Sequence, residues 1–422
     1  MIRAPGTPGT RPVWTAFALA ATFVVACAQP LASPSRSAAV PSAAVPTSSP
    51  ELGRDWVEAG VVDPGEGDPT RTTPPYTNPG SLGHPGAYQG GQADLLDVAS
   101  GPLGLFSVGY LARDIRAEAW SSADGFTWTR SGALAATAGS LANGVAVGES
   151  MITVVGASGA DAAVWTSPDG RAWQAVESAD FRDPAQVSIA TVVPWKDGFV
   201  AAGHVGSLVG PIRAAFWVSH DGTTWRRVAD SPEFADSRVE DLTVSDGSLV
   251  AVGSAGDAKR STGAVTWRSR DPDRWERSAT QDSLGGTVMN SVTAGPEGIV
   301  AVGSDVDAKR AVAWHSADGL TWTRAPDATS LENHGLRIEM RAVAWTPAGY
   351  VAGGHLLFGT QYPAAVVWTS PDGLAWTRAN EPASFSQGKI QGLAAGGPGA
   401  VAVGSFGSPD FSVPTVWVSP GG

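Results

Sequence analysis

The chain has 422 residues and a formal net charge of −12, with 28 Lys and Arg residues against 40 Asp and Glu residues. This acidic balance argues against nucleic acid as a partner, because phosphate backbones are bound through clustered basic side chains. A single cysteine excludes an intrachain disulfide framework. A domain of this length must therefore be stabilised by packing.

Residues 1–27 have the features of an export signal. Arg3 and Arg11 precede an apolar run that is too short to span a bilayer. Residues 24–27, Val-Val-Ala-Cys, resemble a lipobox, the processing site of bacterial lipoproteins. The resemblance implies lipidation of Cys27 and a lipid-anchored location outside the cytoplasmic membrane, in the cell envelope. The alternative is an ordinary signal peptide with an incidental cysteine.

Three segments precede the repeated part of the chain. Residues 28–50 are rich in Ala, Ser and Pro and should form an extended tether. Within residues 51–60, the stretch Gly53-Arg54-Asp55-Trp56-Val57-Glu58 resembles a fourth strand, and we expect it to pair with residues 417–419. The alternative is an isolated Trp in a linker. Residues 61–92, rich in Pro and Gly, are expected to form an irregular surface crossing.

Pairs of tryptophans recur through the rest of the chain. The first Trp of each pair is separated from the next by 45, 52, 50, 47, 54 and 49 residues. These positions are Trp120, Trp165, Trp217, Trp267, Trp314, Trp368 and Trp417. Each unit also has an earlier run rich in Val, Ala and aromatic residues that ends in Gly, which is typical of a strand.

A period near 50 residues is typical of a propeller blade rather than of a helical repeat. We therefore expect an all-β chain with almost no helix, folded as a seven-bladed β-propeller of four-stranded blades over residues 51–422. The N-terminal strand completes the last blade. The expected blades are 93–131, 140–178, 186–229, 238–278, 287–325, 337–380 and 389–422.

A short motif follows the first Trp of each complete unit. Its form is Ser-x-Asp-Gly-x-x-Trp, as in Ser167-Pro168-Asp169-Gly170-Arg171-Ala172-Trp173. This motif resembles the Asp-box, or bacterial neuraminidase repeat, found in sialidase-like propellers and other secreted propellers. Six full copies lie within residues 122–376. The resemblance implies the propeller fold, but not one activity, because the family includes both enzymes and binding modules.

The motif residues have a structural explanation. Gly accepts a positive φ in a tight turn between the third and fourth strands, and the Asp side chain can accept from backbone N–H groups. The motif aspartates are Asp124, Asp169, Asp221, Asp271, Asp318 and Asp372. In one copy Pro272 replaces Gly, so that turn should have a different shape. The motif tryptophans should be buried, as should the apolar residues of the inter-blade connections, Phe181, Phe234, Leu284, Leu331 and Phe385.

Two classes of function remain open: a sialidase-like glycoside hydrolase and a non-catalytic binding or scaffold module. An Arg-Ile-Pro motif, which sialidases carry near the start of the propeller, is absent from the sequence. Arg116, Arg213 and Arg310 precede third-strand tryptophans in alternate blades, but third strands lie about 10 Å outside the innermost strand. Their side chains are not expected to converge, so no catalytic residue is assigned. A third possibility is an assembly factor resembling the Asp-box propeller that helps build photosystem II.

Ligand contacts are expected in the variable loops of one face. The candidates are Arg116, His204, Arg213, Lys259, Arg260, Lys309, Arg310, His355 and Tyr362. We expect no cofactor, no metal and a monomer, with an unknown protein or glycan as partner at the cell surface. Carboxylates with an Arg at the channel mouth would favour an enzyme, and small or apolar residues there would favour binding. The sequence as a whole favours a lipid-anchored binding or scaffold module.

Overall fold

The computed structural model describes residues 56–62 and 93–421, with gaps at 112–114, 135, 207–209, 258–259, 359–361, 380–384 and 409–410. The predicted signal, Cys27, the tether and most of the crossing lie outside the described residues. In the described part, helix is limited to short 3-10 turns, among them Ala179–Phe181, Pro232–Phe234 and Thr329–Leu331. None of the helices described there is long and apolar enough to cross a membrane.

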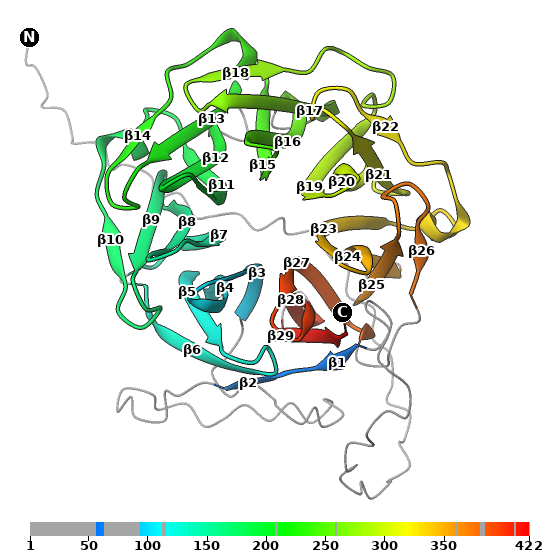
Figure 1. Ribbon diagram of the computed structural model, residues 1–422, viewed down its shortest axis with the longest axis horizontal. Helices are drawn as coiled ribbons and strands as arrows, with labels where there is room; N and C mark the ends of the chain where they lie inside the picture. The colour runs from blue at the N-terminus through cyan, green and yellow to red at the C-terminus, as the bar shows by residue number, and fades with distance from the viewer. Residues whose placement is uncertain are drawn as a thin grey trace, which may run out of the picture. The chain divides into compact units, whose positions relative to one another are not determined.

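The strands form seven sheets arranged around a common axis, which confirms the predicted seven-bladed propeller (Figure 1). Each blade begins with its inner strand and proceeds outward. The inner strands contact one another in sequence around the ring, and the last, β27 (Gly388–Gly396), contacts the first, β3 (Ala93–Gly101). Radial repetition therefore leaves only short strand edges.

The first four blades run from Ala93 to Arg277. Blade 1 is completed by β4 (Gly104–Leu111), β5 (Arg116–Ser122) and β6 (Thr127–Ala133). Blade 2 contains β7 (Ser140–Val147), β8 (Ile152–Ser158), β9 (Asp161–Ser167) and β10 (Gln174–Val176). Blade 3 contains β11 (Val187–Trp195), β12 (Gly198–Gly206), β13 (Ile212–Ser219) and β14 (Trp225–Arg227). Blade 4 contains β15 (Ser237–Ser245), β16 (Ser248–Asp257), β17 (Arg260–Asp271) and β18 (Arg274–Arg277).

The last three blades complete the ring. Blade 5 contains β19 (Thr287–Gly295), β20 (Gly298–Asp305), β21 (Ala311–Ser316) and β22 (Thr323–Arg324). Blade 6 contains β23 (Ile338–Thr346), β24 (Gly349–Phe358), β25 (Tyr362–Ser370) and β26 (Thr377–Arg378). Blade 7 contains β27, β28 (Gly399–Ser408) and β29 (Phe411–Pro420), with its fourth strand taken from the N-terminal segment.

The N-terminal segment joins two blades. Strand β1 (Val57–Glu58) pairs antiparallel with β29, with Glu58 opposite Trp417, which confirms the predicted closure. Strand β2 (Gly60–Val62) then pairs parallel with β6, so blade 1 has a fifth strand that the sequence did not predict. The seam between blades 7 and 1 is therefore held both by packing and by outer-strand pairing.

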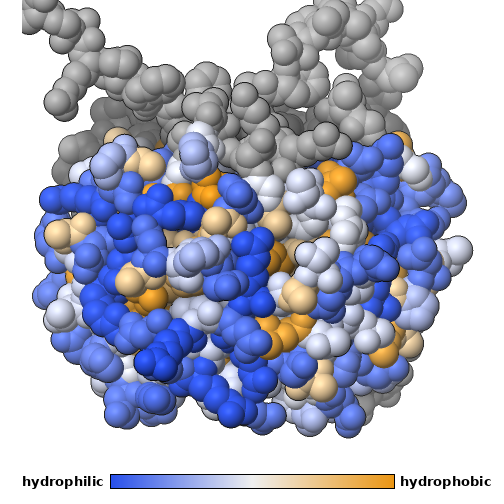
Figure 2. All heavy atoms as spheres, turned by 90° about the horizontal axis from the view of Figure 1, so that it is seen from above, coloured by the Kyte–Doolittle hydropathy of each residue, from blue (hydrophilic) through white to orange (hydrophobic). Residues whose placement is uncertain are grey.

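The core consists of separate apolar layers between neighbouring blades. The seven recurrent third-strand tryptophans are at most 2% exposed, and the apolar residues of the connections, Phe181 to Phe385, are at most 4% exposed. Trp56 is also buried and lies 6.0 Å from the Phe385 ring. These observations confirm that the tryptophans form core rather than a stacking platform. On the side shown in Figure 2, apolar residues are scattered among hydrophilic ones.

The Ser-x-Asp-Gly turns have the predicted geometry. In blade 3, Ser219 Oγ accepts from Gly222 N at 2.8 Å, and Asp221 Oδ1 accepts from the N–H groups of Thr223 and Thr224. Gly222 has φ +75°, a conformation that L side chains rarely adopt. In blade 4 the Pro272 copy differs: Asp271 lies opposite Arg274 in a tighter hairpin.

Candidate functional site

The accessible side of the inner strands defines the candidate site. In the seven inner strands the first and third residues are buried, whereas the second and fourth are partly accessible, apart from the buried Asp94. Because every blade starts with its inner strand, these positions lie at the same end of the ring, around the axis (Figure 1). We use the name axial cluster for the charged side chains at these positions, together with the Tyr and His side chains that lie opposite these positions on β4, β12 and β24. Its members are Asp94, Tyr110, His204, Arg238, Glu240, Glu339, Arg341, His355 and Lys389.

A β-bulge interrupts each inner strand at its fourth residue. The register shifts at the same place in all seven strands, for example between Val239 and Asp241 in β15. An extra residue on one strand re-aims the side chains that follow. The bulge therefore presents the next residue, such as Asp97 or Asp241, to the neighbouring blade.

Asp241 connects three blades through four hydrogen bonds. Its Oδ1 accepts from Thr191 Oγ1 of blade 3 at 3.1 Å and from Leu242 N at 2.7 Å. Its Oδ2 accepts from Ser291 Oγ and Val292 N of blade 5, at 2.8 and 2.9 Å. Both carboxylate oxygens are therefore committed to holding neighbouring blades together.

Asp97 has the same role between blades 1 and 2, where its Oδ2 accepts from Val145 N at 2.9 Å. Burial and, to a smaller extent, the charge of Asp241 raise the pKa of Asp97 to about 7, against the opposing effect of the Val145 hydrogen bond. Burial likewise raises the pKa of Asp241, despite the hydrogen bonds it accepts. Both side chains keep some accessible surface, yet loss of bulk hydration decides their titration.

In blade 6, Glu339 and His355 form a close pair on adjacent strands. His355 Nε2 lies 3.1 Å from Glu339 Oε1. Burial raises the pKa of Glu339, but the hydrogen bond from His355 and the charges of Arg341 and Arg337 outweigh it and lower that pKa to about 2. Glu339 is therefore an ionised acceptor, not an acid that could donate a proton near neutral pH.

At the seam, Asp94 is shared between two blades. Tyr110 Oη donates to Asp94 Oδ2 at 2.8 Å, and Lys389 Nζ of blade 7 lies 3.8 Å from Oδ1. Burial, followed by the charge of Asp94, raises the pKa of Tyr110. This environment opposes formation of a phenolate and keeps Tyr110 a hydrogen-bond donor.

In blade 4, Arg238 and Glu240 form a third pair, with Nε and Oε1 2.6 Å apart. His204 lies nearby on β12; burial lowers its pKa, while Glu240 acts in the opposite direction. The axial cluster thus contains three carboxylates and three basic side chains in addition to the histidines. It is charged, and each of its acids already has a partner.

Arg341 is the basic member best placed to contact a ligand. It is partly accessible and acts on Glu339 through its charge. Among the described residues no hydrogen bond or ion pair fixes its guanidinium. A guanidinium in this position can bind an incoming carboxylate or carbonyl oxygen.

The structure separates the residues that the sequence proposed as ligand contacts. His204 and His355 lie at equivalent positions in the axial cluster, opposite Ser188 and Glu339. Arg213 pairs with Asp183 and Asp230, and Arg310 pairs with Asp327 and Glu332, so both bind inter-blade connections.

The remaining candidates lie at the loops between second and third strands. Arg116 begins β5, and the backbone of Lys309 donates to Asp305 Oδ1. Arg260 and Tyr362 begin β17 and β25, and Lys259 lies outside the described residues. Among the described residues, no cluster of three or more His, Cys, Asp or Glu side chains could hold a metal ion.

Sequence reasoning missed the inner-strand residues Asp97, Asp241, Glu339 and Arg341. One signal could have found the first two. The residue after each bulge always lies 12 positions before the Gly of the second strand, as Asp97 does before Gly109. Alignment of the units on that Gly would have brought together one residue from every blade.

The structure is similar to several solved structures. The structure described as "YCF48 bound to D1 peptide" has a TM-score of 0.50 at 14% identity and covers 78% of this chain and 92% of that one. A Trypanosoma rangeli sialidase in complex with 2,3-difluorosialic acid has a TM-score of 0.44 at 12% identity. The match covers 77% of this chain and 53% of the sialidase. A thermostable family-43 glycoside hydrolase has a TM-score of 0.36 at 12% identity. The match covers 58% of this chain and 93% of the hydrolase.

At these identities the comparison shows the β-propeller fold alone. These propellers include a peptide-bound protein and glycoside hydrolases. A scan against protein-family models found no match, and neither did a search of curated proteins.

Proposed function

We propose that this protein is an exported, lipid-anchored β-propeller that serves as a non-catalytic binding module at the bacterial cell surface. The axial cluster is the proposed binding site. The observation that carries the proposal is the state of its acids: Asp94, Glu240 and Glu339 each have a basic or phenolic partner. The partner on this surface is a protein or glycan that offers an anionic or carbonyl group to Arg341.

A charged axial cluster is the feature that sequence reasoning associated with an enzyme. A glycoside hydrolase, however, needs one carboxyl group that donates a proton and a second that acts as nucleophile or base. Glu339 has a pKa of about 2, which is unsuited to an acid, and Asp241 is saturated by four hydrogen bonds. The carboxylates are thus used for structure and charge balance, which favours binding over catalysis.

Glycoside hydrolysis is the second candidate. It is favoured by the raised pKa of Asp97, about 7, and by the influence of Asp241 on it. A carboxyl group whose pKa lies near 7 beside a second carboxyl group occurs in acid and base catalysts. This candidate requires a sugar to reach both carboxyl groups past the axial cluster.

One experiment distinguishes the two candidates. The purified full chain is tested on a glycan array, on a peptide library and with fluorogenic glycosides that include a sialoside. The proposal predicts binding to at least one glycan or peptide that weakens about 10-fold in Arg341→Gln, with no hydrolysis. Arg274→Gln, an exposed arginine of blade 4, is the control and should bind normally. Turnover that disappears in Asp97→Asn would contradict the proposal and support the hydrolase.

The lipid anchor rests on the sequence of residues 24–27. The proposal predicts that Cys27→Ser moves the protein from the membrane fraction to the soluble fraction and removes lipid from its N-terminus. Mass spectrometry of the N-terminal peptide checks this. A membrane-bound Cys27→Ser protein would contradict the anchor without affecting the binding proposal.

A further inference from the structure

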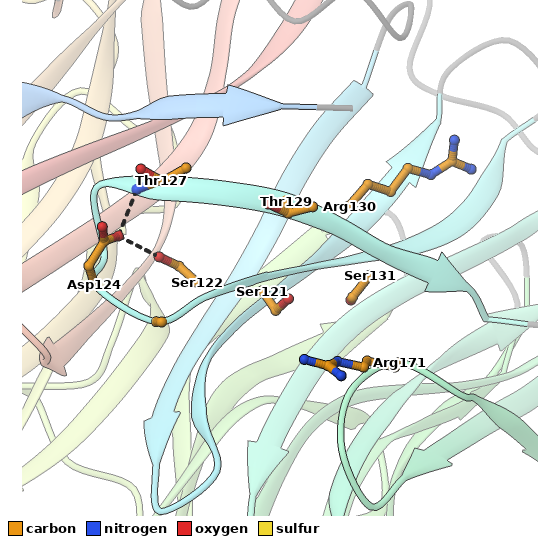
Figure 3. A pocket seen from close by; sticks show the side chains of 9 residues that line it. Ser121, Ser122, Asp124, Thr127, Thr129, Arg130, Ser131 and Arg171 are labelled. Carbon is orange, nitrogen blue, oxygen red and sulfur yellow. Dashed lines mark hydrogen bonds between the residues drawn. The ribbon is translucent and has the colours of Figure 1, made fainter. Parts of the chain in front are cut away.

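A second candidate site lies at the periphery of the ring, between blades 1 and 2. A groove of about 490 Å³ separates β6 from the turn of blade 2 (Figure 3). Its walls carry hydroxyl groups, Asp124 and two arginines, and Ala123 is the one apolar residue that lines it. The groove is therefore suited to a hydrophilic ligand.

The junction around this groove differs from the others. Strand β6 has seven residues, whereas the outer strands β10, β14, β18, β22 and β26 have two to four. In the other complete turns the motif Trp donates Nε1–H to a carbonyl three residues earlier, as Trp128 does to Gly125 O at 2.8 Å. Trp173 instead donates to Ser131 O of blade 1 at 3.1 Å. The long β6 thus draws the blade 2 turn toward blade 1 and forms the wall of the groove.

Ser131 supplies a second, independent sign of a ligand. The residue is 6% exposed, and its hydroxyl lacks any hydrogen-bond partner among the described residues. A buried hydroxyl without a partner is costly, and in native structures an unseen ligand or water commonly satisfies it. Ser131 lines the groove, so a bound molecule can satisfy it.

Two exposed hydroxyls of β6 also line the groove, those of Thr127 and Thr129. They lie on the same side of the strand, because side chains alternate along it. The register of β6 against β5 shifts between Arg130 and Ala133, so this alternation does not extend regularly to Ser131. The groove therefore offers several hydroxyls along β6, which suits a hydroxylated ligand.

The two arginines of the groove differ in whether another side chain already binds them. Arg130 is bound by the fully buried Glu118 and extends away from Arg171 in Figure 3. Arg171 extends below Ser121 and Ser131, and in the described part of the chain no hydrogen bond or ion pair holds its guanidinium. Backbone N–H groups of Arg171 and Ala172 lower the pKa of Asp169 in the same turn, and the charge of Arg171 contributes in the same direction.

Asp124 limits the negative charge that a ligand of the groove can carry. Backbone N–H groups of Thr127 and Phe126 lower its pKa, so this end of the groove carries a negative charge. A polyanion of high charge density would be repelled there, whereas a sugar hydroxyl can donate to the carboxylate. One anionic group at Arg171 and hydroxyl groups elsewhere fit the groove.

We propose that this groove binds an acidic saccharide, with its carboxylate or sulfate on Arg171 and its hydroxyl groups on Thr127, Thr129 and Ser131. This site is separate from the axial cluster and does not include Arg341. The corresponding turn position in other blades is Phe126, Thr223, Asp273, Leu320 or Leu374, so the basic residue is specific to blade 2.

Isothermal titration calorimetry of the full chain tests the proposal with four probes: cellobiouronate, which has a single carboxylate, a monosulfated disaccharide, uncharged cellotriose and inorganic sulfate. At least one acidic saccharide should bind more tightly than cellotriose or sulfate. Arg171→Gln should weaken it about 10-fold, and Ser131→Ala about 3- to 5-fold. Arg274→Gln, the blade 4 control, should bind as the unmodified protein does.

The melting temperature separates a ligand role from a structural one. Ser131→Ala removes a hydroxyl without a partner, so its melting temperature should stay the same or rise. A fall of several degrees would show that Ser131 acts in folding and would overturn its assignment. Equal binding by Arg171→Gln, binding of sulfate alone, or no binding of either acidic saccharide would overturn the proposal.

Discussion

The aspartates of the turns and those at the axis both accept hydrogen bonds from backbone N–H groups, yet their pKa values shift in opposite directions. Hydrogen bonds from Thr127 and Phe126 lower the pKa of Asp124, which lies in an exposed turn. Burial raises the pKa of Asp97 and Asp241 although they accept similar bonds. The comparison shows that access to water, rather than the number of donors, decides the charge state of these groups.

The difference also separates two structural roles. A turn aspartate bonds within its own hairpin, as Asp221 does with Thr223 and Thr224. Asp241 bonds to blades 3 and 5, far from it in sequence. Substitutions in the two sets should therefore affect stability to very different extents.

The largest effect is expected for Asp241→Ala. The change removes the acceptor for two backbone N–H groups and two hydroxyls, each worth about 1–3 kcal/mol when left unsatisfied in the interior. The free energy of unfolding should fall by about 4 kcal/mol or more in urea melts. Asp241→Asn keeps one acceptor oxygen and should lose less. A loss below about 1 kcal/mol for Asp241→Ala would remove the distinction between the two sets.

An intermediate effect is expected for Asp97→Asn, and it should depend on pH. Folding raises the pKa of Asp97 from about 4 to about 7, so the folded state binds a proton more tightly than the unfolded state. The wild type should therefore lose stability as pH rises from 4 to above 7, by about 2–3 kcal/mol relative to the variant. Urea melts at pH 5 and pH 8 measure this. Parallel pH profiles for the two proteins would contradict the raised pKa.

The smallest effect is expected for Asp221→Ala in a turn. Slight burial raises its pKa, but hydrogen bonds from Thr224 and Thr223 outweigh burial and lower it to about 2. The stabilisation is therefore present above about pH 4 and is lost as pH falls toward 2. We expect a loss of about 0.5–1 kcal/mol at pH 7 that disappears near pH 2. The comparison is Asp271→Ala, which should lower the free energy of unfolding by less. In the unmodified protein the Asp271 carboxylate accepts from Asp273 N.

Much of the fold was predictable because the repeat is marked by large residues. The tryptophans set the blade period, and Trp56 identified the closing strand, which pairs with Trp417 as expected. Packing of big rings leaves a clear trace in sequence. The pairing of β2 with β6 was not predicted, because Gly60-Val61-Val62 carries no sign of which strand edge it meets.

The sites were much less predictable. The axial cluster depends on which residues of each inner strand face the axis, and a bulge shifts that assignment after the fourth residue. Ser131 gave no sequence signal, because burial of its hydroxyl without a partner is a property of the packed structure and not of the local sequence. His204 and His355 were found through their equivalent positions, whereas their acidic neighbours were not.

Carbon-13 NMR of the aspartate carboxyl groups across pH 2–9 tests the central claim most directly. The account predicts one carboxyl carbon that titrates near pH 7 and is missing from spectra of Asp97→Asn, while the turn aspartates titrate below their ordinary values. If every aspartate carboxyl titrates below about pH 5, Asp97 and Asp241 are as well hydrated as the aspartates of the turns. That result would contradict the structural role assigned to Asp97.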